Sequence, residues 1–192
     1  MKGFKKIIFC LIGLLVFPAL SWAWQGKVVG VSDGDTITVL HDGQGEKIRL
    51  YGIDTPEKRQ DFGKKAKQFT SKMVFGKIVK VVVHATDRYG RTVGLVYCGK
   101  NDRCLNEELV KHGLAWVYIK YCSKPICDKW RDLEEKARQS RIGLWQAQNP
   151  MPPWTFRHTR KRGSSAQPAE NITNYQYHGN ISSKIFHKPG CR

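Results

Sequence analysis

The sequence contains few acidic residues. It has 16 Asp and Glu against 33 Lys and Arg, which gives a formal net charge of +17 at pH 7. A positive surplus of this size favours a polyanionic partner. The charge alone also fits a binder of cell-surface polyanions, loose attraction to an anionic membrane surface, or a simple need for solubility. Composition therefore points to a class of partner and leaves the function open.

The sequence also lacks an apolar run long enough for a membrane anchor. The apolar stretch 7–20 is shorter than the roughly 18–20 residues that cross a bilayer. Three lysines precede this stretch, and Ser21 and Ala23 place small side chains at the spacing that a signal peptidase reads. These features predict a signal peptide over residues 1–23, cleaved after Ala23. We expect an exported protein, periplasmic or released, with no stable membrane anchor after cleavage.

Tight cysteine pairs of the kind that bind zinc are missing. Cys98 and Cys104, and likewise Cys122 and Cys127, are spaced more widely than the usual tight ligand pairs. In an exported protein, near pairs favour disulfides over zinc. We therefore expect two local disulfides, Cys98–Cys104 and Cys122–Cys127, each stabilising the fold by about 2–3 kcal/mol. Cys191 is then unpaired.

Residues 24–148 have the pattern of one compact domain without internal repeats. Runs rich in β-branched residues predict strands at 26–31, 35–42, 46–53, 77–87 and 91–98. Apolar residues at helical spacing predict helices at 61–76, 105–115 and 128–145. Five strands with a helix after the third indicate an α+β, mainly β fold: a five-stranded Greek-key barrel of the OB type with about three helices.

The character of the chain changes after this domain. Residues 149–174 are proline-rich and basic, then rich in Ser, Gln and Pro, which predicts a disordered linker. Residues 175–192 contain His178, His187 and Cys191, and resemble the start of a small Cys/His accessory module related to the metal-binding segment of alkyl-DNA repair proteins. We favour a truncated remnant, or a basic tail that raises DNA affinity in a salt-dependent way, over loose metal binding.

Two acidic motifs border the second and third predicted strands. Asp35 begins one strand and Asp54 follows the other, so the two carboxylates converge if these strands pair through the turn at 42–45. With the backbone carbonyl of Thr55 they would supply hard oxygen ligands suited to Ca²⁺ or Mg²⁺. Both motifs are also common in ordinary turns. The spacing does not match an EF-hand.

Arginines near these carboxylates favour a phosphate site. Arg49 lies on the strand that leads to Asp54, and Arg91 follows a turn between the later strands. A cation with two guanidinium groups would clamp a phosphate and stabilise the extra charge of a five-coordinate phosphorus. Glu57 could orient or deprotonate an attacking water. On this interpretation the acidic groups hold a cation and the basic groups hold the phosphate.

Three tyrosines near these motifs are candidates for contact with bases. Tyr89 lies in the turn before Arg91, and Tyr118 and Tyr121 lie in an aromatic segment that precedes Cys122. Stacking on such rings tolerates any base sequence. Ordinary half-buried packing is the alternative for all three.

Four motifs in fixed order carry a resemblance to a known family. They are "VSDGDTITV", "IRLYGIDTPE", "TDRYGRTVGLVY" and "LNEELVKHGLAWVY". Residues 24–146 resemble the staphylococcal-nuclease-like (thermonuclease) family. The resemblance implies an OB-fold nuclease that uses Ca²⁺ to hydrolyse DNA and RNA with little sequence specificity, leaving 3′-phosphate ends. The implied partners are DNA and RNA, and we expect a monomer.

The resemblance also implies roles for individual residues. Asp35 and Asp54 would bind the ion through carboxylates and Thr55 through its carbonyl, while Arg49 and Arg91 would contact the scissile phosphate and Glu57 would act on the water. The loop after Glu57 is shorter than in the best-known secreted nuclease, which puts any preference for single strands or ends in doubt. The alternative is a non-catalytic nucleic-acid-binding OB module for extracellular DNA capture, which would not need this complete set.

Overall fold

The structure is a computed structural model that describes residues 22–165, 178–180 and 185–187. The chain divides into two units, residues 1–150 and 151–192, which are described separately. Most of the predicted signal peptide, the linker beyond residue 165 and Cys191 lie outside the described residues. Within the described part, no helix is both long and apolar enough to cross a membrane.

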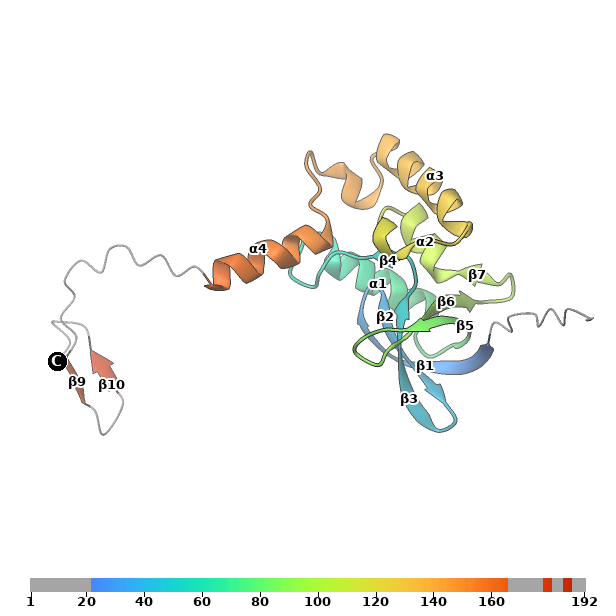
Figure 1. The fold of residues 1–192 in the computed structure, drawn as a ribbon, viewed down its shortest axis with the longest axis horizontal. Coiled ribbons are helices and arrows are strands. Elements are labelled where there is room, and N and C mark those ends of the chain that lie inside the picture. The colour runs from blue at the N-terminus through green and yellow to red at the C-terminus, as the bar shows by residue number, and fades with distance from the viewer. Residues whose placement is uncertain (1–21, 166–177, 181–184, 188–192) are drawn as a thin grey trace, which may run out of the picture. The chain divides into compact units, whose positions relative to one another are not determined.

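The first unit is built on a closed β-barrel, which confirms the predicted mainly β, OB-like fold (Figure 1). Its sheet has the strand order β3-β2-β1-β5-β6-β7, and a parallel pairing of β3 with β6 closes the barrel. Alternating β-branched side chains fill the interior, because every second residue of a strand faces the same side. The strands are β1 (Ala23–Asp33), β2 (Thr36–His41), β3 (Gln44–Leu50), β5 (Ile78–Thr86), β6 (Thr92–Cys98) and β7 (Arg103–Cys104).

The β2–β3 hairpin forms as predicted. Asp42 and Gly43 both have positive φ, 48° and 78°, as the tight turns of two-residue hairpins require. The resulting register pairs His41 with Gln44 at the turn and Thr36 with Arg49 at the far end. Because register is continuous along the hairpin, this turn brings the residues around Thr36 next to the end of β3.

Helices cover the barrel where the periodicity predicts them. Helix α1 (Gly63–Val74) follows the short strand β4 (Ile53–Asp54), which pairs with β8 (Trp116–Val117). Helices α2 (Leu105–Lys111) and α3 (Ile126–Gln139) lie together on one side (Figure 1). The 3₁₀ turns η1 (Ile119–Tyr121) and η2 (Gly143–Gln146) connect and end this helical layer.

The second unit corrects part of the predicted linker. Residues expected to be disordered form helix α4 (Pro153–Ser165), which begins at a proline, a residue well suited to the first helical position. Beyond it, β9 (His178–Asn180) and β10 (Ile185–His187) pair antiparallel, with His178 opposite His187. The predicted disorder therefore does not hold for residues 153–165.

The two predicted disulfides have different outcomes. Cys122 and Cys127 are bonded, as predicted. The predicted Cys98–Cys104 bond is wrong, because both thiols are free. Burial raises the pKa of Cys104 to about 11, so this thiol is protonated at neutral pH.

The strand register explains the missing bond. Cys98 pairs with Arg103, and Cys104 pairs with Tyr97. Neighbouring positions along a strand face opposite sides of a sheet, so the two cysteines are not cross-strand partners. The Cys98 Sγ instead lies 3.6 Å from the carbonyl oxygen of Arg103.

Candidate active site

Two buried carboxylates and one guanidinium form the centre of the candidate site. Nη1 of Arg49 lies 2.5 Å from Asp35 Oδ2, and its Nη2 lies 2.8 Å from Asp54 Oδ1. The side chains of Asp35 and Asp54 are 7% and 2% exposed, so both charges are almost fully removed from water. The structure therefore brings together three residues that the sequence motifs singled out.

The barrel strands position these groups. Thr36 is opposite Arg49, so Asp35 precedes β2 beside the end of β3, and the Leu50 N–H donates to the Asp35 carbonyl at 2.8 Å. After β3 the chain turns at Gly52, whose φ of 70° suits glycine, and continues into β4 with Asp54. A hairpin and one glycine turn are thus enough to make the two carboxylates converge.

Thr55 orients Asp35 through two hydrogen bonds. Its backbone N–H and its hydroxyl donate to Asp35 Oδ2 at 2.7 and 2.9 Å. The Arg49 guanidinium forms an ion pair with the same oxygen, so one cation and two hydrogen-bond donors meet at it. These contacts use the amide and hydroxyl of Thr55, whereas its predicted ligand atom is the carbonyl oxygen.

The electrostatics of this cluster favour its ionised form. Burial alone would raise the pKa of Asp35, but the Arg49 guanidinium and the Thr55 donors hold it below its usual range. Burial would lower the pKa of Arg49, but the nearby carboxylates, Asp35 first, hold it above its usual range. The guanidinium therefore stays charged and held in place.

Asp33 belongs to the same turn, although its motif predicted no role for it. The Asp35 N–H donates to Asp33 Oδ1 at 3.3 Å. Burial and the neighbouring Asp35 raise the pKa of Asp33 to about 7. Its position two residues before Asp35 was the only sequence signal, and its burial could not be read from that signal.

Glu57 lies at the junction between the site and α1. It is half-buried, and its backbone N–H donates to Gln60 Oε1 at 3.2 Å. Gly63, the first residue of α1, packs so closely that a Cβ there would overlap the carbonyl group of Glu57. The start of the helix therefore fixes the backbone at Glu57.

The second predicted guanidinium, Arg91, is held by Asp87 at the other end of a turn. The Arg91 Nε lies 2.7 Å from Asp87 Oδ2, and its backbone N–H donates to Asp87 Oδ1 at 3.0 Å. In the parallel β3–β6 pair, Arg49 is opposite Val93. Arg91 therefore directly precedes the stretch of β6 that pairs with β3, two residues before the partner of Arg49.

The three tyrosines differ in exposure. Tyr89 is 68% exposed and Tyr121 is 56% exposed, so each has an accessible ring. The Arg88 guanidinium lies 4.8 Å from the Tyr89 ring centroid and donates to its hydroxyl at 2.7 Å. Tyr118 is half-buried and packs edge-on against Tyr121, with centroids 4.8 Å apart.

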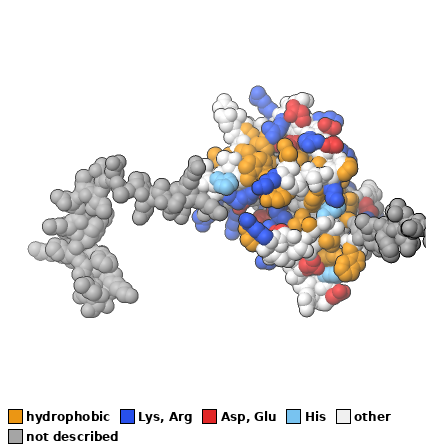
Figure 2. Space-filling model, viewed as in Figure 1, with side chains coloured by type: hydrophobic (Ala, Val, Ile, Leu, Met, Phe, Trp, Pro, Cys, Tyr) orange, Lys and Arg blue, Asp and Glu red, His pale blue; other side chains and the backbone are white. Residues whose placement is uncertain are grey.

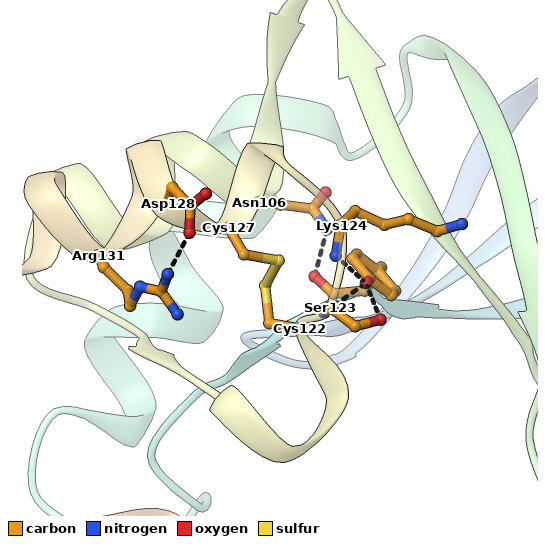
Figure 3. Close-up of a disulfide and its surroundings, with 8 residues drawn as sticks. Asn106, Cys122, Ser123, Lys124, Cys127, Asp128 and Arg131 are labelled. Atoms are coloured by element: carbon orange, nitrogen blue, oxygen red, sulfur yellow. Dashed lines mark hydrogen bonds and ion pairs between the residues drawn. A yellow bond between two sulfur atoms is a disulfide. The ribbon is translucent and has the colours of Figure 1, made fainter.

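Tyr51, for which the sequence motifs predicted no role, anchors the disulfide-closed loop. Its hydroxyl accepts hydrogen bonds from the backbone N–H groups of Ser123 and Lys124 at 3.0 and 3.2 Å, next to the Cys122–Cys127 bond (Figure 3). Tyr51 directly precedes the Gly52 turn. The loop after the aromatic segment is therefore tied to the chain between Arg49 and Asp54.

The donor set has the chemistry expected for a hard cation. Asp35 and Asp54 present converging carboxylate oxygens, which suit Ca²⁺ or Mg²⁺ better than a soft metal. In the described part of the chain, no group of three or more His, Cys, Asp and Glu could hold a metal. The predicted cation site has fewer ligating side chains than such a group. It has two carboxylates, and its third ligand is a backbone carbonyl.

A family model and several similar proteins agree on one family for this chain. The model of the family described as staphylococcal nuclease homologue matches residues 47–147. An uncharacterized endonuclease of Escherichia coli O157:H7 is 39% identical over 158 residues, covering 81% of this chain and 99% of the relative. A micrococcal nuclease of Shigella flexneri is 37% identical over 160 residues, with coverage of 79% and 91%. Staphylococcal-like nuclease CAN1 of Arabidopsis thaliana is 45% identical over 118 residues, with coverage of 62% and 35%.

Proposed function

Because the chain belongs to the staphylococcal nuclease homologue family, we propose that it is a Ca²⁺-dependent nuclease. It hydrolyses phosphodiester bonds of DNA and RNA with little sequence specificity and leaves 3′-phosphate ends. The observation that carries this proposal is the buried Arg49 guanidinium held between Asp35 and Asp54. A protein that only binds nucleic acid through its surface charge would not need this set of residues.

The two carboxylates and the Thr55 carbonyl would hold the cation. When bound, Ca²⁺ would polarise a phosphate oxygen and offset its negative charge. Arg49 has five N–H donors, and its contacts with Asp35 and Asp54 leave others for the phosphate. Because the guanidinium is already oriented, little reorganisation is needed when charge develops on the phosphorus.

Glu57 and Arg91 complete the proposed chemistry. Glu57 accepts a proton from the attacking water or orients that water while its oxygen bonds to phosphorus. The bond from phosphorus to the 5′-oxygen breaks, and the leaving oxygen takes up a proton from solvent. Arg91, which directly precedes the part of β6 that pairs with β3, would add a second cationic donor. The accessible rings of Tyr89 and Tyr121 support stacking on bases of any identity, which fits low sequence specificity.

We also propose that the protein acts outside the cytoplasm. The predicted signal peptide supports export. The Cys122–Cys127 disulfide also fits an oxidising compartment. The surplus of positive charge suits a substrate made of phosphates, and Lys and Arg side chains are spread over the face drawn in Figure 2.

A digestion assay tests the function. Full-length protein should hydrolyse heat-denatured DNA with added Ca²⁺ and show almost no activity with excess chelator. Glu57→Gln should lose most activity and retain binding to single-stranded DNA, while the matched exposed variant Glu135→Gln should behave as wild type. Binding without any hydrolysis by the wild type would instead support the DNA-capture module, and activity that resists the chelator would contradict the metal assignment.

A further inference from the structure

A cavity of about 250 Å³ adjoins the candidate active site. It lies between the turn after β1 and the exposed side of α1. Liquid water occupies about 30 Å³ per molecule, so the cavity has room for a hydrated phosphate group. Its polar lining consists of Asp33, Lys58, Lys64, Lys67, Gln68 and Ser71.

The charge around this cavity is unbalanced. Three lysines line it against one carboxylate. Within the described part of the chain, Lys58, Lys64 and Lys67 form no ion pair, in contrast to Lys80, which lies 2.7 Å from Asp102. Unpaired like charges repel one another, and an anionic ligand would relieve that repulsion.

The wall that carries these lysines is fixed to the active site. The Thr70 hydroxyl of α1 donates to the carbonyl of Gly34 at 2.5 Å, within the turn that joins Asp33 to Asp35. A Cβ on Gly34 would lie 2.8 Å from the Cβ of Ala66, so helix and turn are in direct contact. The start of the same helix packs on the Glu57 carbonyl. The cavity therefore holds a set position relative to the reaction centre.

We propose that Lys58, Lys64 and Lys67 form a phosphate subsite for the nucleic-acid strand, next to the scissile position. The proposal rests on the nuclease function proposed above and extends it to the path of the substrate. Lysine ammonium groups on flexible stems recognise phosphates as point charges and do not read base edges. The subsite holds the strand by its backbone and adds affinity without sequence preference.

The placement favours a strand over a free anion. Asp33 lines the cavity and accepts a hydrogen bond from the backbone of Asp35, a residue of the reaction centre. A strand whose scissile phosphate lies at Arg49 therefore has a further cationic position beside it, on a rigid wall. A free phosphate would need only the cavity.

The test measures binding directly, so it does not depend on turnover. Fluorescence anisotropy would follow a labelled 12-nucleotide oligothymidylate binding to full-length protein in chelator, at several salt concentrations. In Lys64→Gln/Lys67→Gln, the slope of log affinity against log salt should fall by about 1.4, since each single-strand phosphate contact contributes about 0.7. Affinity near 0.1 M salt should fall on the order of tenfold.

A charge-matched control distinguishes local phosphate contacts in the cavity from attraction by the overall positive charge of the protein. Lys72→Gln/Lys136→Gln removes two exposed lysines that do not line the cavity, and its slope should change by less than half as much. An equal loss in this control, or an unchanged slope in the cavity variant, would overturn the proposal. Because both sets of lysines lie on helix surfaces, thermal melting should show that all variants fold.

Two further ligands distinguish a strand from a free anion. A dinucleoside monophosphate has a single phosphate, which the reaction centre would hold, so its affinity should fall much less than that of the 12-mer in the cavity variant. If the variant instead loses affinity for inorganic phosphate and keeps its affinity for the 12-mer, the cavity is a free-anion site and the proposal fails. If the wild type binds DNA through these lysines but hydrolyses none, the subsite stands and the proposed nuclease function fails.

Discussion

Replacing Arg49 with lysine tests the proposed phosphate clamp most directly. The guanidinium spans Asp35 and Asp54 with two nitrogens, at 2.5 and 2.8 Å. A lysine ammonium is a single point charge, and it cannot present two parallel donors to groups on either side. Arg49→Lys therefore keeps the positive charge and loses the bridge.

The expected stability loss follows from these contacts. Removing one partner of a buried ion pair costs about 3–5 kcal/mol, and a hydrogen bond to a charged group contributes about 1.5–3 kcal/mol. Lysine retains a contact with one carboxylate, so we expect the free energy of unfolding to fall by about 2–3 kcal/mol. The variant should fold and be less stable than wild type.

The expected loss of activity is larger. Removing one positioned donor to a developing oxyanion typically lowers kcat by about 10²–10³-fold. Urea denaturation would give the stability change, and initial rates on heat-denatured DNA at saturating Ca²⁺ would give the activity. Arg131→Lys is the matched control, because Arg131 is exposed and pairs with Asp128 on the surface of α3. That control should change stability by less than about 1 kcal/mol and leave the rate unaltered.

Two outcomes would refute this reasoning. Near-normal turnover by folded Arg49→Lys would show that the two-donor geometry is not needed for reaction. Unchanged stability would show that the bridge between Asp35 and Asp54 does not hold the turn together.

Three other substitutions test features around the site. In chelator, Asp33→Asn should stabilise the protein at pH 8 by at most about 4 kcal/mol and much less at pH 4. The reason is that the Asp33 pKa is raised to about 7 in the folded state, so wild type loses stability as pH rises from about 4 to 7. Equal urea midpoints of the two proteins at pH 8 would contradict this. Cys122→Ser/Cys127→Ser should lower the free energy of unfolding by about 2 kcal/mol, and dithiothreitol should lower the melting temperature of wild type but not of this variant. Tyr51→Phe should cost about 1–2 kcal/mol in urea denaturation, since two loop amides lose their acceptor, and a variant as stable as wild type would argue against this anchor.

Local patterns in the sequence were sufficient for the barrel and for the centre of the site. The β-branched alternation and the Asp42–Gly43 turn are short-range signals, and they set the register that places Asp35 beside the end of β3. The Asp35, Arg49 and Asp54 cluster follows from that register and one glycine turn. This is why the predicted convergence of Asp35 and Asp54 agrees with the contacts.

Other features depended on contacts between segments far apart in the chain. The Cys98–Cys104 prediction failed because proximity in sequence does not reveal which cross-strand partner each cysteine has. The anchoring of the 122–127 loop by Tyr51 joins residues more than seventy positions apart.

The cavity and the raised pKa of Asp33 were also decided only by tertiary structure. Lysine-rich helices and Asp-Gly turns are common, and nothing local shows that α1 packs on the turn that carries Asp33. By itself the sequence determined the main strands and helices of the barrel domain and the side chains that converge at the candidate site, because periodicity and turn chemistry act over a few residues. Burial, pKa shifts and the cavity arise when distant surfaces exclude water from one another, and only the folded structure decides where that happens.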